Sequence, residues 1–558
     1  MKKSSLVAAV VSVPFFFAIH GTAQQPTTSL TLYRNGHIYT NDPSSPWAQA
    51  ILVRGEEILA VGDEDEVAAL ADKGAQIVDL EKHFVMPGFN DAHVHIGGAG
   101  EDWVAVRLNG VQNIGELQKR LTEGVAQRKE GEWITGSGWD HTFWPEKKFP
   151  NRQQLDAVSP KNPVMLTHIS GHVAVANSLA LQLAGISKST KSPAGGEIEK
   201  DEKGEPTGML KEGAAMGLVW TKIPPASAEH RRRGIELALA DLVKYGVTSA
   251  QDNSAWEDFL AYRAIKNDGK LTVRITEWLP FLDPLAELEQ KRREGGATDP
   301  WLRTGALKMV TDGALGSRTA AMLAPYSDDA STSGIMTVEP EKLRALAIER
   351  DKAGFQLNFH AIGDRANRVA IDVFEAVAKA NGPRDRRDRV EHAQVVAMSD
   401  FPRFARLQVI ASMQPSHETS DMRWAEQRVG PERVKGAYSW ATMQKFGVRL
   451  AFGTDYDVEP ISPFRGLYAC VTRELPAGGP QGGWQPQEKI SLEDCIRAYT
   501  SGSAYGEFME GKKGELKAGE FADFIVLSND LTKVEPREFT NTKVLRTVVG
   551  GRTVYSVQ

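Results

Sequence analysis

The sequence predicts a mixed α/β protein: a (β/α)8 TIM barrel with an inserted subdomain, joined to a β-sandwich built from both chain ends. Three observations lead to this fold class. Eight short β-like runs in the centre of the chain are mostly followed by helical stretches, the alternation expected of a parallel sheet or barrel. A long segment of mixed character separates the first run from the second. Both chain ends are rich in predicted strands.

The N-terminal residues 1–23 have the pattern of a secretory signal peptide. Lys2 and Lys3 precede an apolar run over residues 6–19, and a small residue at Ala23 allows cleavage there. The alternative, a membrane anchor, is disfavoured because the apolar run is short for a spanning helix. We therefore expect a bacterial periplasmic or secreted protein with no stable membrane association once the signal is removed.

The two parts of the predicted sandwich are residues 24–84 and 509–558. In both, short apolar runs alternate with turn residues, as in "LTLYRNGHIYT" and "VLRTVVGGRTVYSV". The barrel takes residues 85–96 as its first strand and residues 245–508 as its remainder. Its eight β-like runs are "HFVMPGFNDAHVH", "GVTSAQD", "TVRITEWL", "ALKMVTDG", "FQLNFHAIGD", "DRVEHAQ", "VIASMQPSH" and "VRLAFGTDYD".

The segment 97–244 is too long for a single crossover helix and carries β-like pieces of its own, "EWITGSGWDH" and "NPVMLTHISGH". It is therefore predicted to be an inserted subdomain on a loop after the first barrel strand. Because such loops lie on the catalytic face of a barrel, we expect the insert to roof the active site and to shape substrate choice.

Composition narrows the classes of partner. The 558 residues carry a formal net charge of −6, which gives no basic field to hold a nucleic acid. A small molecule is the expected partner, and the sequence leaves open whether the protein forms a homo-oligomer. The only two cysteines, Cys470 and Cys495, exclude a Cys-based zinc site, and the sequence does not determine whether they pair. Any metal must be held by histidine, carboxylate or modified lysine.

Histidines and one aspartate end several predicted strands. His93 and His95 in "PGFNDAHVH" point the same way by strand alternation, into the barrel mouth at the carboxyl ends of the strands. His360 ends "LNFH", His392 ends "RVEH" and Asp455 ends "FGTD". Imidazole and carboxylate ligands are typical of divalent metals, zinc above all.

Each of these residues has a structural alternative when taken singly. His360 fits a core histidine with satisfied hydrogen bonds, His392 a partner of Glu391, and Asp455 a helix N-cap. It is their joint occurrence at strand ends that favours a metal site.

Lys308 in "ALKMVTDGALGSRT" lies within an apolar strand, where an unpaired ammonium is costly to bury. One interpretation is structural, with Asp312 as its partner, because alternation puts both side chains on one face. The other is functional: a carboxylated lysine that bridges two metals.

The residues together resemble the amidohydrolase superfamily, in its amidohydrolase 3 or YtcJ-like branch, which includes N-substituted formamide deformylases. The motifs that carry the resemblance span nearly the whole mature chain in the expected order: "PGFNDAHVH", "LTHISGHVAVANSLAL", "LKMVTDGALGSRTA", "NFHAIGDRAN", "RVEHAQVV", "FGTDYDVEP" and "GELKAGEFADFIVL".

The resemblance implies a metal-dependent hydrolase barrel and a ligand set. His93, His95 and Asp455 would hold a first metal, His360 and His392 a second, and Lys308 would be the carboxylated bridge. The cofactor is then one or two divalent ions, with zinc expected. A hydroxide generated on the metal would attack the scissile carbonyl, and Asp455 would serve as both ligand and catalytic base.

Five further residues are predicted to contact substrate. Asp312 either binds substrate or orients a ligand, and Arg318 is a second candidate; a structural pairing between Asp312 and Arg318 is the alternative. His172 and Trp139 belong to the insert, where the alternatives are a helix-capping histidine and a tryptophan of the insert's own core. His417 ends the seventh strand run, "ASMQPSH".

We therefore expect an amidohydrolase that cleaves a non-peptide amide (C–N) bond of a small molecule. The same ligands suit a dipeptidase or carboxypeptidase-like activity, a lactonase or a deaminase. A catalytically silent ligand-binding protein is the alternative from another class.

Overall fold

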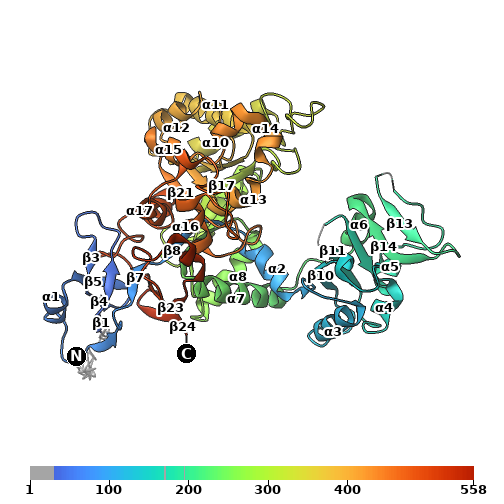
Figure 1. Cartoon of the computed structure of the whole chain (residues 1–558), viewed down its shortest axis with the longest axis horizontal. Helices are drawn as coiled ribbons and strands as arrows, with labels where there is room; N and C mark the ends of the chain where they lie inside the picture. Colours follow the sequence, from blue (N-terminus) through green and yellow to red (C-terminus); the bar gives the residue numbers. More distant parts are fainter. Residues whose placement is uncertain (1–29, 169–170, 194, 558) are drawn as a thin grey trace, which may run out of the picture.

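The computed structural model describes residues 30–168, 171–193 and 195–557, so the signal peptide expected at residues 1–23 lies outside the described residues. The molecule has three parts, and the predicted fold class is confirmed. A barrel stands in the middle, with the sandwich on one side and the inserted subdomain on the other (Figure 1).

The barrel is an eight-stranded sheet in which all neighbours are parallel. It closes where the last strand returns to the first: the Asp455 N–H donates to the His93 carbonyl at 2.8 Å, and Val94 bridges Tyr456. The strands are β8 (Phe89–Val94), β15 (Val247–Asp252), β16 (Arg274–Pro280), β17 (Leu302–Val310), β18 (Leu357–Ala361), β19 (Arg389–His392), β20 (Ile410–Met413) and β21 (Leu450–Phe452).

Amphipathic helices cover the outside of this sheet. In α11 (Asp364–Asn381) the buried residues Ala366, Ala370, Phe374 and Val377 recur every three or four positions and so form one apolar face against the barrel. None of the helices in the described part of the chain is long and apolar enough to span a membrane. The other barrel helices are α2 (Ile96–Val104), α7 (Ala228–Lys244), α8 (Trp256–Asn267), α9 (Leu285–Gly295), α10 (Pro340–Lys352), α12 (Phe401–Leu407), α13 (Pro415–Asp421), α14 (Ala425–Arg433), α15 (Trp440–Lys445), α16 (Pro463–Thr472), α17 (Leu492–Ala498) and α18 (Ser501–Gly506).

Cys470 in α16 and Cys495 in α17 are both buried, and both are free thiols.

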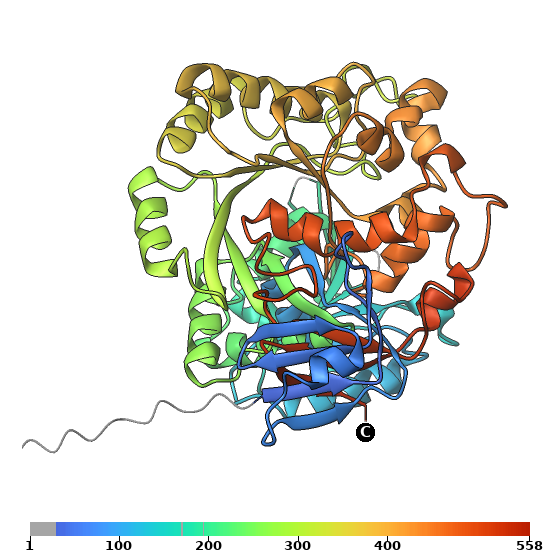
Figure 2. The same ribbon diagram turned by 90° about the vertical axis from the view of Figure 1, so that its left-hand side faces the viewer.

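The sandwich combines strands from both ends of the chain. Segments from the two ends, blue and dark red, lie together in Figure 2. One sheet has the order β5-β4-β1-β6, and the other has the order β24-β23-β22-β7-β2-β3. A shared core that includes Tyr33, Ile51, Phe524 and Val548 joins the two sheets. The elements are β1 (Leu30–Arg34), β2 (His37–Tyr39), β3 (Trp47–Ala48), β4 (Ala50–Arg54), β5 (Glu57–Gly62), α1 (Glu64–Ala68), β6 (Gln76–Asp79), β7 (Phe84–Pro87), β22 (Phe524–Leu527), β23 (Val544–Val549) and β24 (Arg552–Ser556).

The junction between sandwich and barrel falls at Gly88. Residues 85–87, expected in the first barrel strand, belong to β7 and pair with β22, so the barrel strand begins at Phe89. A Cβ at Gly88 would lie 2.1 Å from the Thr248 side chain, which only glycine avoids. The close approach of β15 therefore explains the break between the two strands.

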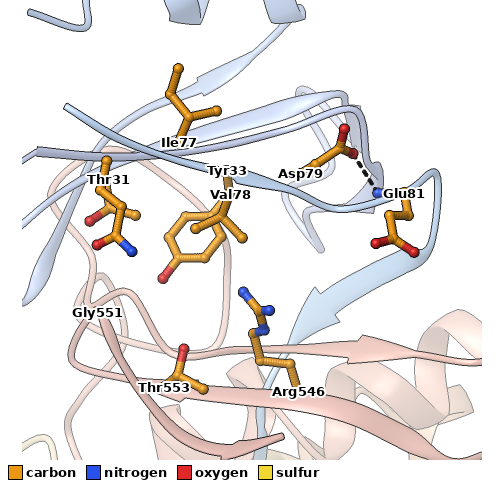
Figure 3. A pocket seen from close by; sticks show the side chains of 10 residues that line it. Thr31, Tyr33, Ile77, Val78, Asp79, Glu81, Arg546, Gly551 and Thr553 are labelled. Carbon is orange, nitrogen blue, oxygen red and sulfur yellow. Dashed lines mark hydrogen bonds between the residues drawn. The ribbon is translucent and has the colours of Figure 1, made fainter. Parts of the chain in front are cut away.

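The sandwich also contains a hollow with a volume of about 550 Å³. Tyr33, Asp79, Arg546 and Thr553 lie on its walls (Figure 3). It holds no histidine and no metal-ligating cluster among the described residues, so it is not a candidate metal centre.

The inserted subdomain has a six-stranded sheet of its own, in the order β13-β14-β12-β11-β10-β9, and two apolar clusters. It is joined to the barrel through α2 and α7. Its elements are β9 (Val106–Arg107), α3 (Ile114–Val125), β10 (Ile134–Trp139), α4 (Arg152–Asp156), β11 (Val164–His168), β12 (Val173–Ala176), α5 (Ser178–Leu183), β13 (Glu197–Lys200), β14 (Pro206–Lys211) and α6 (Glu212–Trp220).

The insert was expected to roof the barrel, but it extends away from it beyond α2 and α7 (Figure 1). Because the subdomain buries its apolar side chains against its own sheet, its fold does not require the barrel mouth as a packing surface.

Candidate metal centre

His93 is held in one orientation by buried neighbours. It is 0% exposed, and its Nδ1 lies 2.8 Å from Glu391 Oε2. Glu391 in turn accepts hydrogen bonds from the Arg389 guanidinium at 2.9 Å and the Ser412 hydroxyl at 2.8 Å. A carboxylate on one ring nitrogen fixes the tautomer, so Nε2 is the atom that His93 presents to the barrel mouth.

Asp455 lies at the centre of four imidazoles. Its Oδ1 is 3.0 Å from His95 Nε2 and 3.7 Å from His93 Nε2. Its Oδ2 is 3.3 Å from His417 Nε2 and 4.0 Å from His392 Nδ1. Each carboxylate oxygen therefore faces a different pair of histidines.

The ligand atoms form two groups that share Asp455. One consists of His93, His95 and Asp455, the other of His392, His417 and Asp455, and within each group the atoms lie within 4.8 Å of one another. Among the described residues, the buried atoms Asp455 Oδ1, His392 Nδ1 and His417 Nε2 make no hydrogen bond. Buried polar atoms are normally satisfied, and divalent cations bound at the two groups would satisfy all three, so this donor set fits a metal.

The charge states of His93, His392 and Asp455 suit ligation, whereas the pKa values of His95 and His417 are raised, because the opposing effect of burial is outweighed by Asp455. Burial lowers the pKa of the His93 and His392 imidazoles well below their usual range. Burial alone would raise the pKa of the Asp455 carboxyl, but the His93 and His417 imidazoles outweigh it and hold that pKa well below its usual range. Neutral imidazoles and an ionised carboxylate are the forms that bind metals.

Two of the ligand-type residues have unusual backbones. His392 has φ of 72° and Asp455 has φ of 58°, in the left-handed region that residues with a Cβ seldom adopt. Such conformations cost about 1–3 kcal/mol each and persist where the surrounding structure fixes them, often at functional sites. His392 is the last residue of β19, and Asp455 follows the end of β21 by three residues.

Lys308 reaches the same centre from β17. Its side chain is buried, and its Nζ lies 3.1 Å from His93 Nε2. The centroid of the Trp278 ring lies 5.1 Å from the Lys308 Nζ. Burial lowers the pKa of the Lys308 amine to about 8, so a sizeable uncharged fraction exists near neutral pH.

Asp312 has no free face for a substrate. Its carboxylate accepts backbone N–H groups from Ala321, Ile362 and Gly363 at 2.9–3.0 Å, and its Oδ1 lies 3.4 Å from His360 Nε2. These contacts fit the orienting role among the two expected for Asp312: it anchors two loops and orients His360.

Arg318 is placed differently from either expectation. It pairs with Asp328 at 2.9 and 3.0 Å, on the surface, and not with Asp312. The reason is that the Asp312 oxygens are already occupied by backbone donors. This pairing leaves Arg318 with a structural contact in place of a substrate contact.

His360 and His417 both pack against the His392 ring, with ring centroids 4.5 and 5.9 Å from it. The His360 Nε2 contacts the Gly313 carbonyl at 3.2 Å. It joins neither ligand group among the described residues, whereas His417, expected to contact substrate, joins the second. Gln394 holds His417 through Nδ1 at 3.1 Å and so directs its Nε2 at Asp455.

The two predicted substrate residues of the insert lie in its own structure. Trp139 is 0% exposed, and its indole N–H donates to the Leu166 carbonyl at 3.0 Å, so it belongs to the core of the subdomain. His172 is exposed and lies 2.9 Å from Glu212. The structural alternative therefore holds for Trp139, and His172 sits on the insert surface.

Sequence reasoning missed two buried carboxylates. Glu391 orients His93, whereas the sequence suggests it only as a partner of His392. Asp91 accepts from the Thr454 N–H at 2.8 Å and so ties the first strand to the residue before Asp455. Alternation was the available signal, because Asp91 shares a strand face with His93.

A cavity of about 460 Å³ opens beside His95. Glu101, Arg231, Asp258 and Asp457 contribute its charged walls. Its lining comes from α2, α7, α8 and the loops after barrel strands, and none of it comes from the six-stranded sheet of the insert. A small molecule fits a cavity of this volume.

A closed parallel barrel with imidazoles and a carboxylate at the carboxyl ends of its strands is the architecture of a metal-dependent hydrolase. The family model described as "Amidohydrolase family" matches residues 76–555, and the chain belongs to this family. The resemblance expected from the motifs is confirmed.

Relatives cover nearly the whole chain. The putative amidohydrolase YtcJ of Bacillus subtilis is 31% identical over 94% of this chain and 99% of its own length. The N-substituted formamide deformylase of Arthrobacter pascens is 29% identical over 93% of this chain and 96% of its own. The crystal structure of an uncharacterized metal-dependent hydrolase from Pyrococcus furiosus superposes with a TM-score of 0.75, at 31% identity, over 90% of this chain and 100% of that one.

Proposed function

We propose that this protein is a metal-dependent amidohydrolase that cleaves a non-peptide amide C–N bond of a small molecule. One observation carries the proposal. Asp455 is buried at the barrel mouth with a pair of imidazoles on each carboxylate oxygen, and three of the buried ligand atoms lack any other partner among the described residues.

His93, His95 and Asp455 would hold one divalent ion, and His392, His417 and Asp455 would hold a second. Zinc suits this nitrogen and oxygen set. A metal bound there supplies a lowered pKa for water and Lewis-acid polarisation of the carbonyl. Asp455, ionised and within reach of both groups, would accept the proton of the attacking water and later donate it to the leaving amine.

Lys308 is the candidate for carboxylation. Its amine is buried next to His93, and burial lowers its pKa to about 8, which provides the uncharged nitrogen that CO2 requires. A carboxylated Lys308 would place oxygen ligands beside His93 in place of a competing positive charge.

The substrate class rests on the relatives and on the cavity. One relative is an N-substituted formamide deformylase. We therefore propose that the substrate of this chain is a related N-acyl amine. The cavity of about 460 Å³ beside His95 would receive the substituent on the amide.

The test compares protein treated with a chelator and protein reconstituted with zinc. Each is assayed for hydrolysis of matched N-formyl amines, N-acetyl amines, dipeptides and lactones. We expect the chelated protein to be inactive, zinc to restore turnover, and the N-acyl amines to react fastest. Full activity in metal-free protein would overturn the mechanism. Dipeptides or lactones as preferred substrates would move the proposal to another bond. Bound metal without turnover of any compound would favour a binding protein.

The proposal includes export through residues 1–23 to the periplasm or medium. Cell fractionation with N-terminal sequencing of the recovered protein tests it. The expected mature N-terminus follows Ala23, and a cytoplasmic full-length chain would contradict export.

A further inference from the structure

The inserted subdomain carries a second cluster of ligand-type side chains, remote in the chain from the barrel ligands. Asp140 and His141 directly follow β10, and His168 ends β11. These two strands are parallel neighbours, and Trp139 pairs with His168 in their register. The carboxyl ends of parallel neighbours meet at one edge, which brings the three polar side chains together.

The geometry of this cluster suits a metal. One ligand atom from each of the three residues lies within 4.8 Å of the other two, and His168 Nε2 is 3.6 Å from Asp140 Oδ1. The rings of His141 and His168 have centroids 5.6 Å apart. The His141 Nδ1 atom is buried and has no hydrogen-bond partner among the described residues.

Hydrogen bonds and ring contacts hold the three side chains in place, and they leave the Asp140 carboxylate without a lysine or arginine partner among the described residues. Asp140 Oδ1 accepts from the Thr142 N–H at 2.9 Å and the Thr142 hydroxyl at 2.6 Å, which holds the carboxylate in place. Its only ion pair within the described chain is with His168, so no lysine or arginine balances its charge. Phe149 packs 4.1 Å from the His141 ring and Trp139 packs 4.7 Å from the His168 ring.

We propose that Asp140, His141 and His168 form a second divalent-metal site, in the inserted subdomain, that is separate from the barrel centre. Two imidazoles and one carboxylate are a zinc-type ligand set, and three protein ligands leave a fourth position for water or a small anionic ligand. The cation would supply a partner for His141 Nδ1 and neutralise Asp140. It would also join the ends of β10 and β11 to the turn that follows β10.

The test counts Co²⁺ ions bound to the full chain. A barrel-null variant, His93→Ala with His95→Ala and Asp455→Asn, removes ligands from both barrel groups. We expect it to keep about one tightly bound Co²⁺ per chain, with the visible absorption of a tetrahedral site. Adding His168→Gln or Asp140→Asn should abolish that binding, while the control His172→Gln, four residues on from His168, should leave it unchanged.

Single variants keep the test decisive if the combined variants do not fold. In the otherwise unaltered protein, His141→Gln should lower the metal content by one equivalent and leave the barrel metal in place. Unchanged metal content in both His141→Gln and Asp140→Asn, with a native circular dichroism spectrum, would overturn the proposal. Because this count is independent of turnover, its outcome is separate from that of the hydrolase proposal.

Discussion

The barrel mouth and the insert cluster both use histidines and an aspartate at the ends of parallel strands, yet they are built differently. In the barrel, the ligands come from strand ends around a closed ring, and Glu391 and Asp91 brace them from beneath. In the insert, two adjacent strands and one turn supply all three side chains. A closed barrel therefore brings together side chains from segments far apart in the sequence. The edge of an open sheet brings together side chains from adjacent strands only.

Asp455→Asn should have the largest effect, because this carboxylate faces both imidazole pairs and is the proposed base. We expect kcat/KM for an N-acyl amine to fall by at least about 10³-fold, within the range of a lost general base. Steady-state kinetics and metal content measure it. The matched control is Asp201→Asn, on an exposed turn of the insert, and equal activity of the two variants would break the comparison.

Trp139→Ala tests whether the insert is held by its own core. Removing a fully buried tryptophan should lower the free energy of unfolding of the subdomain by about 3–5 kcal/mol. The metal content of the barrel should not change, because Trp139 packs in the apolar core of the inserted subdomain. Denaturation followed by circular dichroism, with metal analysis of the same samples, measures both. A loss of barrel metal would show that the two regions are coupled.

The Lys308 amine predicts a pH dependence of stability in metal-free, CO2-free protein. Burial lowers its pKa from 10.5 to about 8, so between these values the unfolded chain binds a proton that the folded protein lacks. The free energy of unfolding should therefore rise with pH from 8 to 10.5, by about 3 kcal/mol in total. Lys308→Met should remove this rise. An identical pH profile for both proteins would mean that the amine is not desolvated.

Glu391→Gln should have a smaller effect, because it disturbs the orientation of one ligand and removes none. Loss of such a carboxylate typically weakens metal binding by about 10–100-fold. Competition with a chelator of known affinity measures it. Ser412→Ala, which removes only one of the hydrogen bonds to Glu391, is the matched control and should change affinity less. Unaltered affinity in Glu391→Gln would show that Glu391 serves folding alone.

The barrel could be predicted from the sequence because two local signals agreed in it. Strand alternation predicts that the His93 side chain points into the barrel. The ends of the predicted strands place His392 and Asp455 at the barrel mouth. His360 and His417 could not be told apart, since which nitrogen reaches the centre depends on contacts with Gly313 and Gln394, which lie in loops after other barrel strands. Side-chain orientation set by distant neighbours carries no local pattern.

The insert was predicted to exist, but its position and the roles of its residues were not. Trp139 follows the same strand pattern whether it lines a cavity or fills a core, and only the packing of the subdomain decides. The boundary at Gly88 depends likewise on the approach of Thr248 from a strand 160 residues later, which no local motif records.

A crystal structure with anomalous scattering data at the zinc edge tests the central claim most directly. We predict a peak about 2.0–2.2 Å from an Asp455 oxygen and from the nitrogens of His93 and His95, with any second peak beside His392 and His417. Zinc-loaded crystals with no peak within reach of Asp455 would contradict the assignment of this barrel mouth as the metal centre.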